Sequence, residues 1–172
     1  MTKIIRAEQS TEEEIKKILH PLVTEWFFSK FPEFSLPQKS GVVSIWKRKN
    51  ILISAETGGT KTLTAFLSIL NHLIILAEKQ ELKNKVYAVY TSPLKALSND
   101  IHKNLIEPLH EIEELASKKD IKLQKIRIAL RTGDTTASDR AKMLKNPPHI
   151  LITTPESLAI ILTSKNFVDN MK

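Results

Sequence analysis

The stretch that decides the fold runs from residue 50 to residue 62 and reads Asn50-Ile51-Leu52-Ile53-Ser54-Ala55-Glu56-Thr57-Gly58-Gly59-Thr60-Lys61-Thr62. Its first part, 50–54, is a short apolar run, which predicts a β-strand. An amphipathic stretch over 62–78 predicts a helix directly after the glycines. A strand, a tight glycine-containing loop and a helix that opens with Lys-Thr are the context of a phosphate-binding loop.

The residue types of this loop suit a nucleoside triphosphate. Gly58 and Gly59 allow backbone N–H groups to wrap phosphate oxygens, because neither residue has a Cβ. Lys61 is expected to reach the terminal phosphates, and the Thr62 hydroxyl is expected to hold a magnesium ion that arrives with the nucleotide. The start of the helix adds a partial positive charge beneath the anion. We therefore predict that the loop amides and the Lys61 ammonium grip a triphosphate.

Two positions depart from the usual phosphate-loop pattern. Thr60 stands directly before the lysine, where glycine is usual, and Ala55 takes the first position. A β-branched residue is strained if the loop needs a positive φ at that point, and its Cβ can crowd a phosphate. The alternative interpretation, a glycine-rich turn capped by Thr60 or Thr57 at a helix start, therefore stays open.

Three further apolar runs follow along the chain, at 86–91, 126–130 and 150–153. Amphipathic stretches lie between them and predict helices over 94–116 and 138–145, with another helix that includes Leu158. Short apolar strands that alternate with helices predict an α/β fold, in which a parallel sheet is covered on both faces.

The first 48 residues predict short helices. Thr11 and Glu14 have the spacing of a capping box, and Pro21 is expected to separate this first helix from a second. The pairs Phe31-Pro32 and Leu36-Pro37 predict a loop, because the residue before a proline avoids helical geometry. A third helix is predicted over 38–47.

Composition excludes several classes of protein. The 172 residues include no cysteine, which excludes disulfide scaffolds, cysteine nucleophiles and thiolate zinc sites. The most apolar window, 63–77, is shorter than a membrane span needs and contains Asn71 and His72, so we expect no membrane partner. No secretory signal follows Met1, and a cytoplasmic protein is the expectation.

The formal net charge of +7 is compatible with a polyanionic partner. We expect most of the charged side chains of the 47–49 run and of Arg127, Arg131 and Arg140 to be solvated at the surface.

A polar motif follows each of the three later strands, beginning at Ser92-Pro93, Arg131-Thr132 and Thr153-Thr154. Open α/β sheets bind ligands at the carboxyl ends of their strands, so these motifs are candidate contacts. Thr154 and Pro155 are expected to be the N-cap and first residue of a helix, a natural phosphate site that reads no base. Plain capping is the alternative for Thr154 and Ser157.

The order and spacing of these motifs, together with Pro37-Gln38 and 55–62, resemble the first RecA-like domain of superfamily 2 DEAD/DEAH-type helicases. The segments 20–28 and 147–158 look like the Lhr (large helicase-related) branch of that family. The resemblance implies a truncated three-layer RecA-like domain with a mostly parallel sheet over 49–172, preceded by N-terminal helices over 1–48 that carry a Q-motif-like segment.

The resemblance also implies roles by position, with ATP and Mg²⁺ as cofactors. Gln38 would read adenine, and Thr62 would stand on the magnesium side of the nucleotide. The implied ATP-binding residues are Gln38, Thr57, Gly58, Gly59, Thr60, Lys61 and Thr62. The implied contacts to the backbone of DNA or RNA, independent of base sequence, are Pro93, Lys95, Thr132, Gly133, Thr154, Pro155 and Ser157.

The family's acidic magnesium motif begins Asp-Glu, and no Asp-Glu pair occurs in these 172 residues. No complete catalytic set is therefore expected here, and the remainder of a helicase, with its second RecA-like domain, is the implied partner. Two alternatives remain. One is a non-catalytic nucleic-acid-binding or interaction module from a split or decayed helicase gene. The other is an unrelated P-loop enzyme such as a kinase, which leaves Thr154 to Ser157 unexplained.

Overall fold

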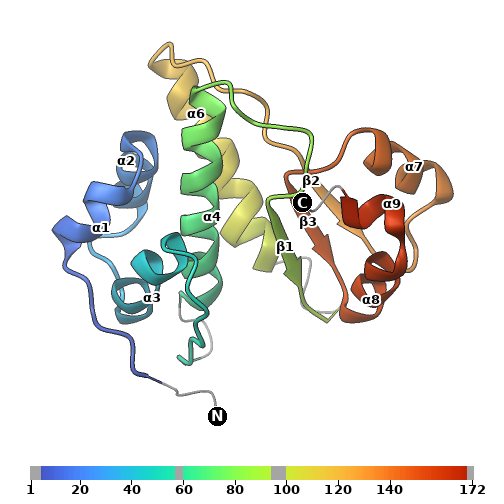
Figure 1. Cartoon of the computed structure of the whole chain (residues 1–172). Coiled ribbons are helices and arrows are strands. Elements are labelled where there is room, and N and C mark those ends of the chain that lie inside the picture. Colours follow the sequence, from blue (N-terminus) through green and yellow to red (C-terminus); the bar gives the residue numbers. More distant parts are fainter. Residues whose placement is uncertain (1–4, 57–59, 94–99, 170–172) are drawn as a thin grey trace. The chain divides into compact units, whose positions relative to one another are not determined.

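A computed structural model describes residues 5–56, 60–93 and 100–169 of the chain, and these residues divide into two compact units (Figure 1). The first, here called the helical unit, comprises Met1–Lys79 and Ile101–Leu123. The second, here called the sheet unit, comprises Gln80–Asp100 and Gln124–Lys172. Each unit is described by itself below.

The helical unit is built around its longest helix, α4. Its elements are α1 (Glu12–Ile18), α2 (Pro21–Lys30), α3 (Leu36–Trp46), α4 (Lys61–Glu78), the π-helical turn η2 (His102–Ile106) and α6 (Glu107–Lys118). Figure 1 shows α4 between the three N-terminal helices and α6. Its buried face carries Phe66, Leu67, Leu70, Leu73 and Ile74, none of which is exposed. Burial of these side chains, together with apolar residues of the neighbouring helices, stabilises this unit.

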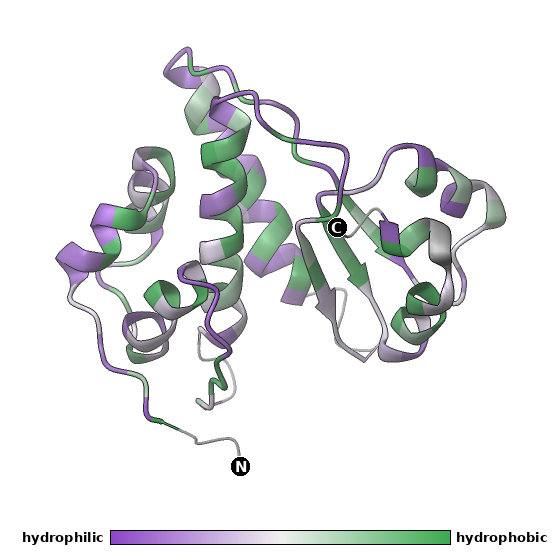
Figure 2. Cartoon of the chain, in the orientation of Figure 1, coloured by the Kyte–Doolittle hydropathy of each residue, from purple (hydrophilic) through white to green (hydrophobic). Residues whose placement is uncertain are grey.

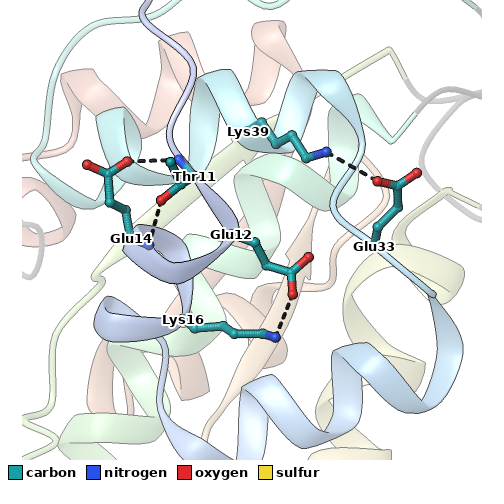
Figure 3. Close-up of polar contacts among 6 residues, drawn as sticks. All are labelled: Thr11, Glu12, Glu14, Lys16, Glu33 and Lys39. Atoms are coloured by element: carbon teal, nitrogen blue, oxygen red, sulfur yellow. Dashed lines mark hydrogen bonds and ion pairs between the residues drawn. The ribbon is translucent and has the colours of Figure 1, made fainter.

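The first helices begin where the sequence predicts. The Thr11 N–H donates to Glu14 Oε2 at 2.8 Å, and the Glu14 N–H donates to Thr11 Oγ1 at 3.2 Å, which forms the predicted capping box. Ion pairs between Lys16 and Glu12 and between Lys39 and Glu33 lie on the surface nearby (Figure 3). Pro21 is the first residue of α2, so it separates α1 from α2 as predicted.

The sheet unit contains three parallel strands in the order β1-β3-β2. Its elements are β1 (Ala88–Thr91), β2 (Ile128–Arg131), α7 (Ala137–Lys145), β3 (Ile150–Thr153), α8 (Pro155–Thr163) and α9 (Lys165–Val168). Every residue of the central strand β3 is buried, as expected for a strand with neighbours on both sides. Val86, Leu151, Ile161 and Phe167 form the core on the side of α8 and α9, and Met143 of α7 packs against it.

The register places three strand ends at one edge of this sheet. Thr91 pairs with Thr153, which pairs with Arg131 on the other side. The Ser92 N–H donates to the Thr153 carbonyl at 3.3 Å, and the Thr153 hydroxyl donates to the Arg131 carbonyl at 2.7 Å. The motifs that follow the three strands therefore start side by side, as the parallel arrangement predicts.

The strand predicted over 50–54 is wrong. Residues 51–56 alternate between half-buried and exposed side chains, with Leu52 90% exposed, but they belong to none of the strands in the described residues. Period-2 alternation requires only an extended backbone with one covered face, whereas a strand also requires a hydrogen-bonded neighbour. Ile53 supplies the covered face, since its Cδ1 lies 3.1 Å from a Cβ built on Gly41 of α3.

Two further expectations change for reasons that involve proline. Leu36 and Pro37 open α3 instead of forming a loop, because proline is tolerated in the first turn of a helix. The helix predicted over 94–116 is not uniform in the part that the structure describes. It widens into η2, where the Glu107 N–H bonds to the His102 carbonyl, directly before Pro108. Proline has no N–H to donate and its ring crowds the preceding turn. The backbone hydrogen bonds therefore change there from the α-helical to the π-helical spacing.

Helix α4 is long and apolar enough to cross a membrane by length and composition alone, and it is the one such helix among the described residues. Figure 2 shows it mostly green, with purple bands. Its polar side chains Ser68 and Asn71 are buried and bond to backbone groups of α3 and α1. Such contacts are those of a core helix in a helical bundle.

Gly41 sets the distance between α3 and α4. A Cβ built on Gly41 would lie 2.7 Å from Thr64 Cγ2, and Thr64 is fixed by a hydrogen bond from its Oγ1 to the Thr60 carbonyl. We expect Gly41→Ala to lower the free energy of unfolding by about 1 kcal/mol, because overpacking exceeds the gain in helix propensity. Urea denaturation measures this change. Gly133→Ala is the matched control, since a Cβ there meets nothing within 4 Å. Equal stability of both variants would contradict the prediction.

His149, directly before β3, is expected to make the sheet unit sensitive to acid. Its ring is 1% exposed, Nδ1 accepts a hydrogen bond from the Arg127 N–H, and burial together with the Arg127 charge lowers its pKa to about 4. The unfolded chain binds this proton near pH 6.5, so the stability that neutral His149 provides is complete above that pH and declines as pH falls toward 4.

Thermal melts between pH 7 and pH 4 test this expectation. We expect the melting temperature to fall over this range less steeply in His149→Asn, which keeps an acceptor for the Arg127 N–H, than in the wild type. The exposed His102 offers the control His102→Asn, which is expected to follow the wild type. An unchanged slope in His149→Asn would overturn the assignment.

Candidate nucleotide and nucleic-acid sites

Lys61, the predicted phosphate ligand, is the first residue of α4. Its ammonium donates to the carbonyl oxygens of Ala55 and Glu56, both at 2.6 Å. The charge is therefore held by two peptide oxygens of the segment that the sequence predicts to bind phosphate. A bound phosphate would have to replace these two acceptors, and an anionic oxygen is the stronger acceptor of the two kinds.

Thr60, the residue that stands in place of the usual glycine, is the N-cap of α4 with φ −73° and ψ 25°. Because φ is negative, Thr60 does not carry the backbone strain that a positive φ would cause. Its hydroxyl makes a short hydrogen bond with the Ser35 hydroxyl, the N-cap of α3. This bond joins the start of α4 to the start of α3. Thr57, Gly58 and Gly59 lie outside the described residues.

Gln38, the predicted adenine reader, lies on the first turn of α3 and is 1% exposed. Its Oε1 accepts the Ser35 N–H at 2.8 Å, which completes a capping box. Because that N–H requires an acceptor, the contact fixes the orientation of the amide. The Nε2 group is buried and has no hydrogen-bond partner among the described residues. A buried unpaired donor is costly, and it suits an acceptor that is supplied from outside the chain.

These residues form one polar chain at the N-terminal ends of α3 and α4. It runs from the Gln38 amide through Ser35 and Thr60 to the half-buried first turn of α4, which carries Lys61 and Thr62. The first N–H groups of a helix lack intrahelical partners and favour an anion. These elements therefore place an ammonium, helix-end amides, hydroxyls and one buried amide donor at the N-terminal ends of α3 and α4.

The remaining predicted residues lie in the sheet unit, at the edge where the three strand ends meet. Thr154 is the N-cap of α8, and its Oγ1 bonds to the Ser157 N–H at 3.3 Å and to the Ser157 hydroxyl at 3.1 Å. Pro155 is the first residue of α8 and is exposed, as is Pro93 after β1. The capping contacts account for both hydroxyls within the chain, and the predicted nucleic-acid role of these residues stays a prediction. Lys95 lies outside the described residues.

Thr132 and Gly133 form a tight turn after β2. The Thr132 N–H donates to Thr135 Oγ1 at 2.8 Å, and the Thr135 N–H returns to the Thr132 carbonyl at 3.2 Å. Gly133 is exposed, and its carbonyl accepts a hydrogen bond from Arg140 Nη2 at 3.0 Å. The turn therefore has a hydrogen-bonded backbone, and Gly133 lies on its exposed side.

Three arginines of the sheet unit make contacts within the chain that the sequence does not predict. Arg127 donates from Nε and Nη2 to the Pro147 carbonyl and from Nη2 to Asn84 Oδ1. Arg131 lies over the Phe167 ring, and Arg140 bonds to Gly133. These three side chains are half-buried, so the expectation of a solvated surface holds only in part, because each contacts another group of the sheet unit. The 47–49 run is exposed, as expected.

Comparison with known proteins places the chain among helicases. The profile of the DEAD/DEAH box helicase family matches residues 35–172. The chain is 51% identical over 162 residues to the ATP-dependent helicase Lhr-Core protein 2 of Thermococcus barophilus, a match that covers 94% of the chain and 19% of that relative. It also resembles the structure of Mycobacterium smegmatis helicase Lhr bound to ssDNA and AMP-PNP, with a TM-score of 0.75 and 37% identity over 86% of the chain and 18% of that protein.

A more distant structure shares the fold. The DEAD-box helicase Mss116, bound to ssRNA and UDP-BeF, matches with a TM-score of 0.67 and 22% identity, covering 93% of the chain and 31% of Mss116. The parallel sheet and surrounding helices are thus those of a RecA-like helicase domain. The chain spans about a fifth of the length of the curated Lhr-Core relatives that it matches.

Proposed function

The chain belongs to the DEAD/DEAH box helicase family, and from this membership we propose that it is the nucleotide-binding part of an ATP-dependent Lhr-type helicase that acts on DNA or RNA. The observation that carries the proposal is the polar chain from Gln38 to Lys61. It supports a site in which one end meets a base and the other end meets phosphates, because hydrogen bonds link Gln38, Ser35 and Thr60, and Lys61 follows Thr60 directly in the chain.

The residues present fit a nucleoside triphosphate. The buried Gln38 Nε2 lacks an acceptor, and a purine base offers one in a ring nitrogen. Lys61 would leave the Ala55 and Glu56 carbonyls for the terminal phosphates, which offer full negative charge. Thr60 and Ser35 would keep the two ends at a fixed separation.

Magnesium would be held through the nucleotide. Within the described residues, no group of three or more His, Cys, Asp or Glu side chains is arranged to hold a metal ion. The Thr62 hydroxyl, on the first turn of α4, would bind the magnesium ion together with oxygens of the nucleotide phosphates. The ion would neutralise phosphate charge. Hydrolysis also needs acidic and cationic groups beyond those of this chain, which the second RecA-like domain of the whole helicase would share in supplying.

Nucleic acid would lie along the edge of the sheet unit. Pro93, Gly133 and Pro155 are exposed at three neighbouring strand ends, and Lys95 follows in sequence. None of these groups distinguishes one base from another, so the contact would be with the sugar–phosphate backbone.

A second candidate function is a non-catalytic nucleic-acid-binding module. The specific observation in its favour is that the Lys61 ammonium is already satisfied by two peptide oxygens. This candidate predicts binding of an oligonucleotide without binding of ATP.

Isothermal titration calorimetry of the 172-residue chain separates the two functions. The chain is titrated with ATP in magnesium, with CTP in magnesium, and with a single-stranded oligonucleotide. The helicase proposal expects heat of binding from ATP and the oligonucleotide, with CTP weaker because its smaller base does not reach Gln38. An oligonucleotide that binds while ATP does not supports the module and overturns the nucleotide site.

A further inference from the structure

Thr60 stands where the phosphate-loop pattern has glycine, and its side chain makes a contact that glycine could not make. The Thr60 hydroxyl and the Ser35 hydroxyl form a hydrogen bond. Thr60 is the N-cap of α4 and Ser35 is the N-cap of α3, so this bond joins the starts of two helices. The hydroxyl makes no capping bond to α4 itself, and its contact is therefore with α3.

The Ser35 hydroxyl offers Thr60 a fixed point of attachment. Phe34, directly before Ser35, is 1% exposed, and its ring stacks on the Phe27 ring with 4.4 Å between the two ring centres. The Ser35 N–H donates to Gln38 Oε1 at 2.8 Å. Ser35 is thus held by the aromatic core on its N-terminal side and by the first turn of α3 on its C-terminal side.

A second contact holds the start of α4 against α3. The Thr60 carbonyl accepts hydrogen bonds from the Thr64 N–H at 2.8 Å and from the Thr64 hydroxyl at 2.7 Å. Thr64 is completely buried, and its Cγ2 lies only 2.7 Å from the position of a Cβ built on Gly41 of α3. Glycine at position 60 would keep the carbonyl and this second contact, but it would lose the bond to Ser35.

These contacts determine the spacing between the two ends of the polar chain. Gln38 lies on the first turn of α3, and Lys61 lies on the first turn of α4. A ligand that meets both residues has to reach from one helix to the other. If the spacing of the two helices varied, binding of the second end would carry an additional entropic cost, and a fixed spacing removes that cost.

We propose that Thr60 is a positioning residue, whose bond to Ser35 holds the Gln38 end and the Lys61 end of the site at the spacing of one nucleoside triphosphate. The inference rests on the proposed function, because that function supplies a ligand with a base at one end and phosphates at the other. Its consequence is the reverse of what the phosphate-loop pattern suggests. Threonine at this position strengthens nucleotide binding, and the usual glycine would weaken it.

Calorimetric titrations with ATP and with inorganic tripolyphosphate, both in magnesium, test this role. Tripolyphosphate has no base, so it reports on the Lys61 end alone. We expect Thr60→Val and Thr60→Gly each to weaken ATP binding about fivefold, the effect of one hydrogen bond, and to leave tripolyphosphate binding within about twofold of the wild type. Thr60→Ser keeps the hydroxyl and is expected to bind ATP as the wild type does.

A double-mutant cycle with Ser35→Ala isolates the hydrogen bond from the other effects of each substitution. The double variant Ser35→Ala/Thr60→Val should bind ATP no more weakly than the weaker of the two single variants, because both remove the same bond. Thr163→Val, at the exposed end of α8, is the control for the loss of a threonine hydroxyl and should bind both ligands as the wild type does. The melting temperature of each variant reports on its fold.

Unchanged or tighter ATP binding in Thr60→Val and Thr60→Gly would overturn the role of Thr60 and leave the proposed function standing. Equal losses for ATP and tripolyphosphate would also overturn it, because Thr60 would then act on the phosphate end alone. If the wild type binds neither ligand, the nucleotide-binding part of the proposed function fails, and the inference fails with it.

Discussion

Lys61→Ala is expected to weaken the binding of magnesium-ATP at least about tenfold, the largest effect on binding that we expect of any single substitution. The ammonium is the one cationic side chain in the polar chain that joins Gln38 to α4. It is free to exchange its partners, since both present acceptors are neutral carbonyls of the adjacent loop. When phosphate oxygens replace these carbonyls, the ammonium bonds to a negatively charged acceptor instead of a neutral one. Alanine removes this contribution to ATP binding.

Calorimetry with ATP in magnesium measures the effect, and Lys79→Ala is the matched control. Lys79 caps the other end of α4 and is exposed, so its loss changes the net charge equally without touching the loop. Circular dichroism checks that α4 is intact in both variants. ATP affinity that is equal in Lys61→Ala and the wild type would remove Lys61 from the site, and with it the proposed position of the phosphates.

Asn71→Ala is expected to lower the free energy of unfolding by about 2–4 kcal/mol. Asn71 lies in the middle of α4 and is completely buried. Its Oδ1 accepts the His20 N–H at 2.6 Å, and its Nδ2 donates to the Ile18 carbonyl at 2.9 Å. Both backbone groups belong to the turn between α1 and α2. Alanine would leave both unpaired in the core and open a cavity beside them.

Urea denaturation followed by far-UV circular dichroism measures this loss. Asn50→Ala serves as the control, because Asn50 is exposed. A change of less than about 0.5 kcal/mol in Asn71→Ala, the range of ordinary surface substitutions, would show that the turn does not depend on this amide. His20→Ala would then be the informative next variant, since the His20 ring also caps α2 through the Leu22 N–H and pairs with Glu78.

The features that sequence predicts well are those with local causes. The capping box at Thr11 and the helix start at Thr154 depend on residues three apart, and both are present. The run 150–153 is a strand as predicted, because its buried apolar residues suit the centre of a parallel sheet. The stretch 50–54 shows the opposite case. Its pattern is that of a strand, but pairing is a relation between two segments, and the pattern of one segment does not contain it.

In the candidate site, too, some features have a local sequence signal and others depend on contacts between distant residues. The motif predicts Lys61 and Thr62, and the resemblance predicts Gln38. The spacing Ser35-x-x-Gln38 is a capping-box signal that could have moved the predicted start of this helix from Gln38 back to Leu36. The contacts of Arg131 with Phe167 and of Thr60 with Ser35 join residues 36 and 25 positions apart, and neither pair carries a local signal. Only the folded chain shows that these residues meet.

The extended segment 51–56 has a practical consequence for anyone who handles this polypeptide. Residues 51–54 make no backbone hydrogen bond to another described residue, and Leu52 projects from the same segment into solvent. An open row of amides and carbonyls with an apolar side chain beside it is a template on which a second molecule can add a strand. Concentrated solutions of the isolated polypeptide should therefore self-associate through this segment, and a charged side chain at position 52 should keep them monomeric.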